Sequence, residues 1–314
     1  MIRRVVFMGT PDFAVPSLKA IHSAGHTIAG VYSKPDSPAG RGRGLTPPPI
    51  KEAALQLGLP VYQPQSLRSS EVLKELAALA PEVIVVAAYA QLLPQSVLSL
   101  PKFGCKNIHA SLLPKYRGGA PIHWAIVNGE SETGITIMQM ARGLDTGDMI
   151  LQERIPIHIN QTCGDIFNEL ADLGAKLILE VLSLGDLGES QRIEQNDPDS
   201  SYARNVTKED ARLDFNNSAL GIHNQVRGFN PWPGAFTTVN GNYLRILQSS
   251  LSEEPFVLAP GLVEMRADKV FVGCSDTCLE IQAVQPAGKK IMSAADFLRG
   301  YNNKELGTRL FFAT

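Results

Sequence analysis

An uninterrupted apolar stretch, Val-Ile-Val-Val-Ala-Ala at positions 83–88, constrains the fold of this chain more than any other feature. A strand with one face in water alternates apolar and polar side chains, whereas a strand of a parallel sheet is buried on both faces and shows no such alternation. The stretch therefore predicts a central parallel strand in an α/β domain, with helices on both faces of the sheet.

Short β-branched runs alternate with helical patterns through the first half of the chain. Residues 4–8 and 28–33 have the composition of strands. A helix is expected to begin near Pro11 between them, because proline is well tolerated at the first helical position. Another helix follows Ile50, and the segment around Asn107 forms the strand after the apolar stretch. This order predicts a Rossmann-like, doubly wound parallel sheet.

Composition narrows the class of protein. The 314 residues are 44 % hydrophobic with a net charge of −2, which favours two globular domains and gives no overall sign of a polyanion or an anionic membrane as ligand. The four cysteines are scattered without a Cys-x-x-Cys pair, which favours a reduced, cytoplasmic protein without a metal site. No segment has the length of a signal peptide core or a membrane span. The turn at residues 9–12 lacks the spaced glycines that admit a pyrophosphate, so NAD is not expected.

The second half of the chain has a different pattern. Thr162 and Asp165 form a capping pair that predicts a helix through about Leu184, and the polar, acidic stretch after it is typical of a linker. Five or six short strands follow, with an Asn-Gly hairpin signal at 240–241, and they indicate a small OB-like β-barrel. The expected organisation is an α/β domain at residues 1–189, a linker at 190–206 and an OB-like domain at 207–314.

A segment rich in glycine and proline lies at positions 35–49. Eight of its fifteen residues are Gly or Pro, a composition that we expect to exclude regular structure and to form a mobile loop. Arg41 and Arg43 are its only cations. A solvated connection is one interpretation. However, long loops inside α/β domains commonly bind a ligand, and two arginines presented by glycines suit contacts to phosphate.

Asn107 and His109 carry the clearest chemical signal. Alternate side chains of a strand point to one face, so these two polar groups emerge side by side near the carboxyl end of a strand, where open α/β sheets bind ligands. Burying both destabilises a fold unless they meet a hydrogen-bonding partner, which indicates a chemical role. Asp145 lies in a glycine-flanked loop at 143–148. Such a carboxylate is by default a turn residue, but beside an imidazole it fixes the tautomer and stabilises the protonated ring.

No convincing nucleophile accompanies Asn107, His109 and Asp145. Ser111 lies two residues beyond His109, but the chain lacks the Gly-x-Ser-x-Gly turn that exposes a serine hydroxyl, so a serine hydrolase is a minor alternative. The three groups suit direct attack of a substrate amine on an activated carbonyl. Asn107 and His109 would stabilise the oxyanion, and Asp145 would organise removal of the amine proton.

Three sequence blocks resemble the formyltransferases that use 10-formyltetrahydrofolate. They are Asn107-x-His-x-Ser-Leu-Leu-Pro114, Gly119-Ala-Pro-Ile122 and Leu144-Asp-Thr-Gly-Asp148. Further blocks resemble the members of this family that formylate the methionine carried by initiator tRNA, namely Gly9-Thr-Pro-Asp-Phe13, Pro38-Ala-Gly-Arg-Gly42, Phe229-Asn-Pro-Trp-Pro233 and Gln285-Pro-Ala-Gly-Lys-Lys290. The resemblance covers essentially the whole chain.

The resemblance implies roles for matching positions. Asn107, His109 and Asp145 would be the catalytic trio, and 10-formyltetrahydrofolate would be a consumed cosubstrate, with no permanently bound cofactor. Besides Asp145, the formyl-folate site would include residues after the apolar stretch and residues after His109, namely Tyr89, Gln91, Leu92, Leu93, Ser111, Leu112, Leu113 and Pro114. For Leu92 and Leu93 an ordinary core position is a nearly equal alternative.

The partner implied by the resemblance is initiator methionyl-tRNA. Arg41 falls where the family grips the acceptor stem, Arg43 lies beside it, and the OB-like domain would hold the outer face of the tRNA. Residues 190–314 contain 13 Lys or Arg against 14 Asp or Glu, so this domain needs a local cluster of cations, because phosphate neutralisation drives most RNA binding. Its members would be Arg204, Lys208, Arg212, Lys289 and Lys290, with a solvated surface as the alternative. The family expectation is a monomer.

Other interpretations stay open. An amino-sugar formyltransferase could share the N-terminal blocks and even a small barrel. A formyl-folate hydrolase would use water in place of the amine, and a non-catalytic RNA-binding protein could retain the scaffold alone. The arginines at 35–49 favour tRNA over a sugar, and the intact trio speaks against a non-catalytic protein. The expected activity is transfer of a formyl group from 10-formyltetrahydrofolate to the α-amine of methionyl initiator tRNA.

Overall fold

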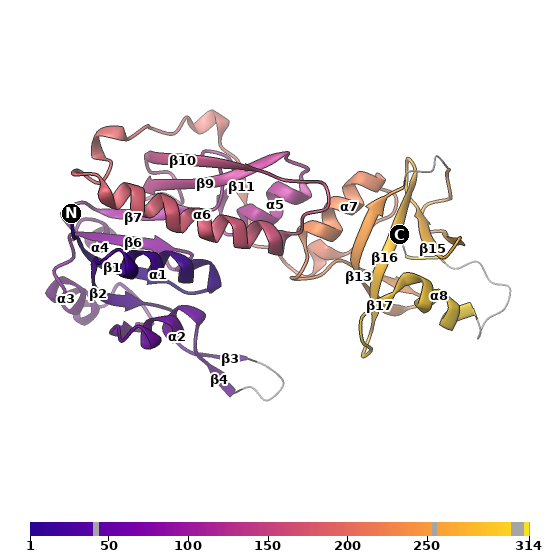
Figure 1. Cartoon of the computed structure of the whole chain (residues 1–314), viewed down its shortest axis with the longest axis horizontal. Helices are drawn as coiled ribbons and strands as arrows, with labels where there is room; N and C mark the ends of the chain where they lie inside the picture. The colour runs from indigo at the N-terminus through magenta and orange to yellow at the C-terminus, as the bar shows by residue number, and fades with distance from the viewer. Residues whose placement is uncertain (40–43, 253–255, 303–310, 314) are drawn as a thin grey trace. The chain divides into compact units, whose positions relative to one another are not determined.

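The computed structural model describes residues 1–39, 44–252, 256–302 and 311–313. The chain divides into two compact units, each of which is described by itself. Unit 1 contains residues 1–121, 133–155 and 167–204, and unit 2 contains residues 122–132, 156–166 and 205–314. Figure 1 shows the helices and strands of both units.

A seven-stranded sheet forms the centre of unit 1. Its strand order is β10-β9-β7-β6-β1-β2-β5, so β6 lies in the middle. The strands are β1 (Arg4–Gly9), β2 (Thr27–Tyr32), β5 (Val61–Tyr62), β6 (Val83–Ala87), β7 (Cys105–His109), β9 (Glu132–Gln139) and β10 (Met149–Pro156). The pairs from β5 through β7 are parallel, whereas β9 is antiparallel to β7. Every residue of β6 is buried, which confirms the central strand expected from its apolar sequence.

Helices cover both faces of this sheet, as a doubly wound fold requires. They are α1 (Val15–Ser23), which follows the short helix η1 (Asp12–Ala14), α2 (Pro49–Gln56), α3 (Ser70–Ala78), α4 (Gln95–Leu98) and α6 (Cys163–Ser183), which begins in unit 2. On one face α6 lies directly on β7, because a Cβ at Gly174 would be 2.7 Å from Ile108 Cγ2. In Figure 1, α1 and α6 lie in front of the sheet.

The opposite face of the sheet packs on α3 and α4. A buried cluster there joins Leu76 of α3, Val97 of α4 and Cys105 of β7. Side chains alternate along a strand, so Asn107 and His109 share the face of Cys105, while Ile108 contacts α6. The site residues of β7 therefore emerge on the α3 and α4 side of the sheet.

The glycine- and proline-rich segment differs from the expectation. β3 (Ser37–Ala39) and β4 (Gly44–Thr46) form a two-stranded antiparallel pair, so the prediction that residues 35–49 hold no regular structure is wrong. Each strand of an isolated pair has an outer edge without a neighbour, and Pro38 is tolerated there although it has no N–H to donate. Arg41 and Arg43 lie outside the described residues.

Unit 1 ends with the residues up to Arg204, most of which fall in the linker expected at 190–206. This stretch contains the short helices η2 (Glu189–Gln191) and η3 (Asp197–Asp199), followed by β11 (Tyr202–Ala203). β11 pairs in parallel with β8 (Arg117–Gly118). The residues up to Arg204 are grouped with the first compact unit.

Unit 2 is built on a six-stranded, mainly antiparallel sheet. Its strands are β12 (Phe236–Val239), β13 (Asn242–Leu251), β14 (Val263–Arg266), β15 (Lys269–Gly273), β16 (Cys278–Pro286) and β17 (Met292–Ser293), in the order β12-β13-β16-β15-β14 with β17 on β16. Its helices are α5 (Pro121–Val127), η4 (Glu209–Ala211), α7 (Ala219–Gly228) and α8 (Ala294–Asn302). Asn240 and Gly241 both have positive φ, which confirms the predicted hairpin turn.

The sheet of unit 2 curls toward a barrel. Phe312 bridges to Val239 of β12, and Phe311 bridges to Leu262 next to β14, so one short segment connects the two ends of the strand order. Phe312 also belongs to the buried core, with Phe215, Ile246 and Val272. These features confirm the expected OB-like unit. Across the described residues, no helix is both long and apolar enough to cross a bilayer.

Candidate active site

Asn107 and His109 lie side by side at the carboxyl end of β7. Val86 of β6 is opposite Asn107, and Thr136 of β9 is opposite His109. Only 8 % of Asn107 and 6 % of His109 is exposed. The neighbouring strands thus hold both polar side chains in a fixed, largely dry position at the edge where α/β sheets bind ligands.

His109 has one ring nitrogen committed to the protein backbone. Its Nε2 is 3.0 Å from the carbonyl oxygen of Tyr116. A carbonyl can only accept, so Nε2 carries a hydrogen and Nδ1 is the basic nitrogen of the neutral ring. Nδ1 lies 3.7 Å from Asp145 Oδ2, which is too long for a hydrogen bond but close enough for charge attraction. A proton taken up at Nδ1 would therefore face a carboxylate.

Asp145 is held through both its side chain and its backbone. The backbone φ angle of Asp145 is +52°, a conformation that is uncommon for residues other than glycine. Oδ2 accepts a 2.8 Å hydrogen bond from the Gly118 N–H. The carbonyls of Asp145 and Gly147 accept hydrogen bonds of 2.8 and 2.7 Å from Gln195 Nε2. The structure thus brings His109 and Asp145 together, as the sequence predicts.

The side-chain amide of Asn107 has a different environment. Within the described residues it makes no hydrogen bond to protein, although it is almost fully buried. Its free N–H groups are therefore available to an oxygen atom of a bound ligand.

The residues just beyond His109 form a firmly bonded turn. Ser111 is 1 % exposed, and its hydroxyl donates to the Lys115 carbonyl at 2.7 Å. Thr136 Oγ1 donates to the Ser111 carbonyl and accepts from the Leu113 N–H, while Gln152 donates to the Leu113 carbonyl. Because the serine hydroxyl is buried and bonded, it does not serve as an exposed nucleophile. Leu112 and Pro114 are partly buried in the same turn.

The stretch after β6 separates into core and surface residues. Tyr89 and Leu93 belong to the buried cluster on the α4 side of the sheet, whereas Leu92 is 70 % exposed. Gln91 and Leu92 line a pocket of about 400 Å³. Burial raises the pKa of Tyr89 to about 12, and its hydroxyl has no hydrogen-bond partner in the described part of the chain.

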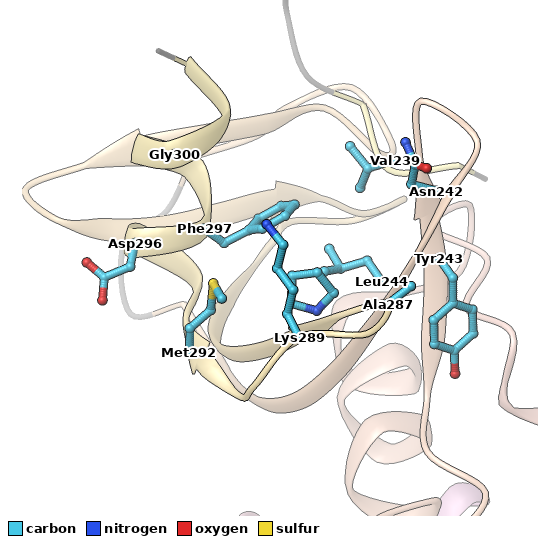
Figure 2. A pocket seen from close by; sticks show the side chains of 11 residues that line it. Val239, Asn242, Tyr243, Leu244, Ala287, Lys289, Met292, Asp296, Phe297 and Gly300 are labelled. Atoms are coloured by element: carbon cyan, nitrogen blue, oxygen red, sulfur yellow. The ribbon is translucent and has the colours of Figure 1, made fainter. Parts of the chain in front are cut away.

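The cations expected to bind RNA come from different turns. Arg204 ends unit 1, Lys208 and Arg212 belong to the η4 turn, and Lys289 and Lys290 belong to the turn after β16. Lys289 lines a pocket of about 580 Å³ between β13, β17 and α8 (Figure 2). Arg212 Nη1 is 3.8 Å from Glu209, so its charge is partly balanced.

Several groups at the site carry no recognisable sequence pattern. Tyr116 and Gly118 contribute only backbone atoms, which no residue type reveals. Arg117 is 2 % exposed and donates to Gln195 Oε1 at 3.0 Å and to Asp197 Oδ1 at 2.8 Å. Gln195 is one of several amides in a polar stretch. Among the residues that the structure describes, no group of three or more His, Cys, Asp or Glu side chains is arranged to hold a metal ion.

This architecture and site define an enzyme of the formyl transferase class. Residues 3–182 match the family model described as formyl transferase, and residues 205–302 match the formyl transferase C-terminal domain. The chain is 46 % identical to the methionyl-tRNA formyltransferase of Macrococcus caseolyticus (strain JCSC5402) over 98 % of both chains. It is 49 % identical to that of Pelotomaculum thermopropionicum over 95 % of both chains. The chain therefore belongs to the formyl transferase family, in its methionyl-tRNA formyltransferase branch.

Solved structures share the fold at lower identity. The N-formyltransferase from Helicobacter canadensis, in complex with folinic acid and dTDP-3-aminofucose, is 21 % identical with a TM-score of 0.65, over 90 % of this chain and 99 % of that chain. HypX from Aquifex aeolicus, in complex with tetrahydrofolic acid, is 18 % identical with a TM-score of 0.63, over 96 % of this chain and 48 % of that chain. At these identities the likeness concerns the fold alone.

Proposed function

We propose that this protein transfers the formyl group of 10-formyltetrahydrofolate to the α-amine of methionine esterified to initiator tRNA. The observation that carries the chemistry is the approach of Asp145 to His109 beside the unpaired amide of Asn107. The acceptor is supported by the match to methionyl-tRNA formyltransferases over at least 95 % of this chain.

In the proposed reaction the unprotonated amine attacks the formyl carbon. A new C–N bond forms, the carbonyl π electrons move to oxygen, and the attacking atom must start about 3 Å from the carbon. The oxyanion accepts hydrogen bonds from the Asn107 amide and from a proton on His109 Nδ1. Nδ1 lies too far from Asp145 Oδ2 to make a hydrogen bond to it, so this proton is available to the oxyanion.

Asp145 handles the proton of the attacking amine. It takes this proton directly or through water, and the proton then passes to N10 of the folate as the C–N10 bond breaks. The products are formylmethionyl-tRNA and tetrahydrofolate, so the atoms and the proton balance. The 2.8 Å bond from the Gly118 N–H holds one carboxylate oxygen in place during the transfer.

The formyl-folate site is proposed to lie on the α4 side of the sheet. Asn107 shares this face with the cluster containing Tyr89 and Leu93, and Gln91 and Leu92 line a pocket in the same stretch. The turn from Ser111 to Pro114, fixed by Thr136 and Gln152, forms another part of the site. A pterin heteroatom would also supply the partner that the buried Tyr89 hydroxyl lacks.

We propose that a set of lysine and arginine side chains binds the tRNA, and that the protein is a cytoplasmic monomer. Arg41 and Arg43 would meet the acceptor end, with Arg204, Lys208, Arg212, Lys289 and Lys290 on the outer face. We propose residues 1–189 as the catalytic domain, 190–206 as the linker and 207–314 as the tRNA-binding domain. Changing Arg41 to Ala should raise the KM for charged tRNA and leave the KM for the folate unchanged; an unchanged tRNA KM would exclude this contact.

The deciding experiment offers several acceptors to the purified protein with 10-formyltetrahydrofolate. Methionyl-tRNA should be formylated with a kcat/KM far above that for other aminoacyl-tRNAs or amino sugars, and folate consumption without an acceptor should be negligible. Preference for an amino sugar would reassign the acceptor. Release of formate without any acceptor would make the protein a hydrolase.

A further inference from the structure

We propose that Gln195 is a positioning residue for the Asp145 carboxylate and that residues 195–203 are part of the active-site scaffold. This inference rests on the proposed function, because it concerns the geometry of the same His109 and Asp145 pair. It assigns a catalytic purpose to a stretch that its polar composition marks only as a connection between domains.

Gln195 binds the loop of Asp145 through an unusually complete set of hydrogen bonds. It is 7 % exposed, and its single amide nitrogen donates both to the Asp145 carbonyl and to the Gly147 carbonyl, at 2.8 and 2.7 Å. Its amide oxygen accepts from Arg117 Nε at 3.0 Å. An arginine can only donate, so the Gln195 oxygen faces Arg117 and the nitrogen faces the loop.

Asp145 needs such an external hold. Its φ of +52° lies in the left-handed region, where a residue with a side chain is strained and stays only if its surroundings fix it. One amide bridging two carbonyls of the same turn provides that constraint. Without the bridge the loop can relax, and the 3.7 Å separation between Asp145 Oδ2 and His109 Nδ1 changes with it.

The same stretch also fixes the partners of the two catalytic side chains. Ser201 accepts from the Tyr116 N–H at its hydroxyl, at 2.9 Å, and from the Arg117 N–H at its carbonyl, at 2.8 Å. Ala203 pairs with Gly118 in the β8–β11 ladder. Tyr116 supplies the carbonyl that orients His109, and Gly118 supplies the N–H that binds Asp145.

Asp197, at the protein surface, binds the arginine that contacts Gln195. Its carboxylate accepts from Arg117 Nη2 at 2.8 Å, and it is 79 % exposed while Arg117 is 2 % exposed. Arg117 thus connects the solvent-exposed turn of η3 to the buried amide of Gln195. The last segment of unit 2 begins at residue 205, so the stretch that holds the catalytic loop leads directly into that segment along the chain.

The test compares Gln195→Met and Gln195→Glu with Gln191→Met. Methionine keeps the volume without a donor, and glutamate keeps an acceptor for Arg117 while losing the N–H groups. Gln191 lies shortly before Gln195 in the chain, is exposed, and its side chain has no hydrogen bond within the described residues, so it is the matched control. Steady-state formylation of methionyl-tRNA and the ¹⁵N signals of the His109 ring are measured for each variant.

Both Gln195 variants should lower kcat by about 10- to 100-fold, because a small misplacement of a catalytic group has that effect. The KM values for both substrates should stay within about threefold, and the His109 ring signals should move, while Gln191→Met matches the wild type. A kcat within about twofold of the control in Gln195→Glu would overturn the proposal, as would unmoved ring signals in both variants. If the wild type does not formylate methionyl-tRNA, the proposed function fails, and the ring signals still decide whether Gln195 positions the pair.

Discussion

His109 in unit 1 and His223 in unit 2 are both almost fully buried, but their ring nitrogens have different partners. His223 has a hydrogen bond at each nitrogen, 3.0 Å to Ser249 Oγ and 2.8 Å to the Ile159 carbonyl. His109 has one hydrogen bond, to Tyr116, and its other nitrogen faces a carboxylate at 3.7 Å. A ring with both nitrogens bonded has no group left for a substrate. The nitrogen without a hydrogen bond, rather than burial, therefore distinguishes His109, the histidine that we propose as catalytic.

The difference extends to the surroundings of the two rings. Burial, together with the charge of Arg227, lowers the pKa of His223, so this ring stays neutral in the folded protein near neutral pH. Its neighbours are satisfied by the protein itself, which makes it a structural group. The neighbours of His109 include the Asn107 amide, which makes no hydrogen bond within the described residues and is available to a ligand.

The largest expected effect separates the two histidines by activity. Changing His109 or Asn107 to Ala should lower kcat/KM by about 10²- to 10⁴-fold, because each removes a group that acts on the reacting atoms. His223→Asn should leave kcat within about twofold of the wild type at a temperature where the variant is folded. Initial rates with methionyl-tRNA measure both. Near-normal turnover in His109→Ala would make that ring structural too, and the comparison would fail.

A second substitution tests whether activity depends on backbone geometry near His109 and Asp145 as well as on their side chains. Gly118 has φ of +115°, and a Cβ there would lie 2.6 Å from the Ala203 carbonyl oxygen. Gly118→Ala should therefore shift the N–H that binds Asp145 and lower kcat/KM by about 10- to 100-fold.

Gly58 provides the control for this substitution. It also has positive φ, at +68°, but nothing lies within 4 Å of the added Cβ. Gly58→Ala should lower the free energy of unfolding by about 1 kcal/mol and leave activity unchanged. Equal activity in the two alanine variants would show that the Gly118 N–H does not position Asp145.

The pH dependence of stability should reveal His223. Its pKa is lowered from the ordinary value of 6.5 in the folded state, so below pH 6.5 the unfolded chain binds more protons than the folded one. The stability that His223 contributes is fully present above pH 6.5 and is lost as pH falls through the folded pKa. His223→Asn should cost about 1–3 kcal/mol at pH 7.5. The gap between wild type and variant should narrow toward pH 5 in denaturant titrations; a constant gap would contradict a neutral, buried ring.

The sequence predicts most of the secondary structure, because a strand buried on both faces of a sheet has a recognisably apolar sequence and caps and turns have characteristic residues. The apolar run of β6, the Thr162 and Asp165 cap and the Asn240-Gly241 turn each depend on local side-chain chemistry, and all three are present. The Gly/Pro-rich segment was predicted wrongly, because composition describes the average of a stretch and not the pairing of its two ends as β3 and β4.

The sequence indicates residues of the candidate site only where their side chains carry the signal. Asn107, His109 and Asp145 combine residue types that are rare at strand ends and in loops unless they have a chemical use. Gln195 left no comparable trace, because its partners are carbonyls 48 and 50 residues away. Tyr116 and Gly118 contribute backbone atoms, whose part in the site the pattern of side chains along the sequence does not reveal.

The smallest expected effect concerns the hydroxyl of Tyr89, which is buried without a hydrogen-bond partner within the described residues. If the folate supplies the partner, Tyr89→Phe should raise the KM for 10-formyltetrahydrofolate by about 5- to 10-fold, the loss of one hydrogen bond. The free protein should become no less stable, because the substitution removes an unpaired buried group. An unchanged KM for the folate, together with a higher free energy of unfolding, would show that Tyr89 belongs to the structural core and does not contact the folate.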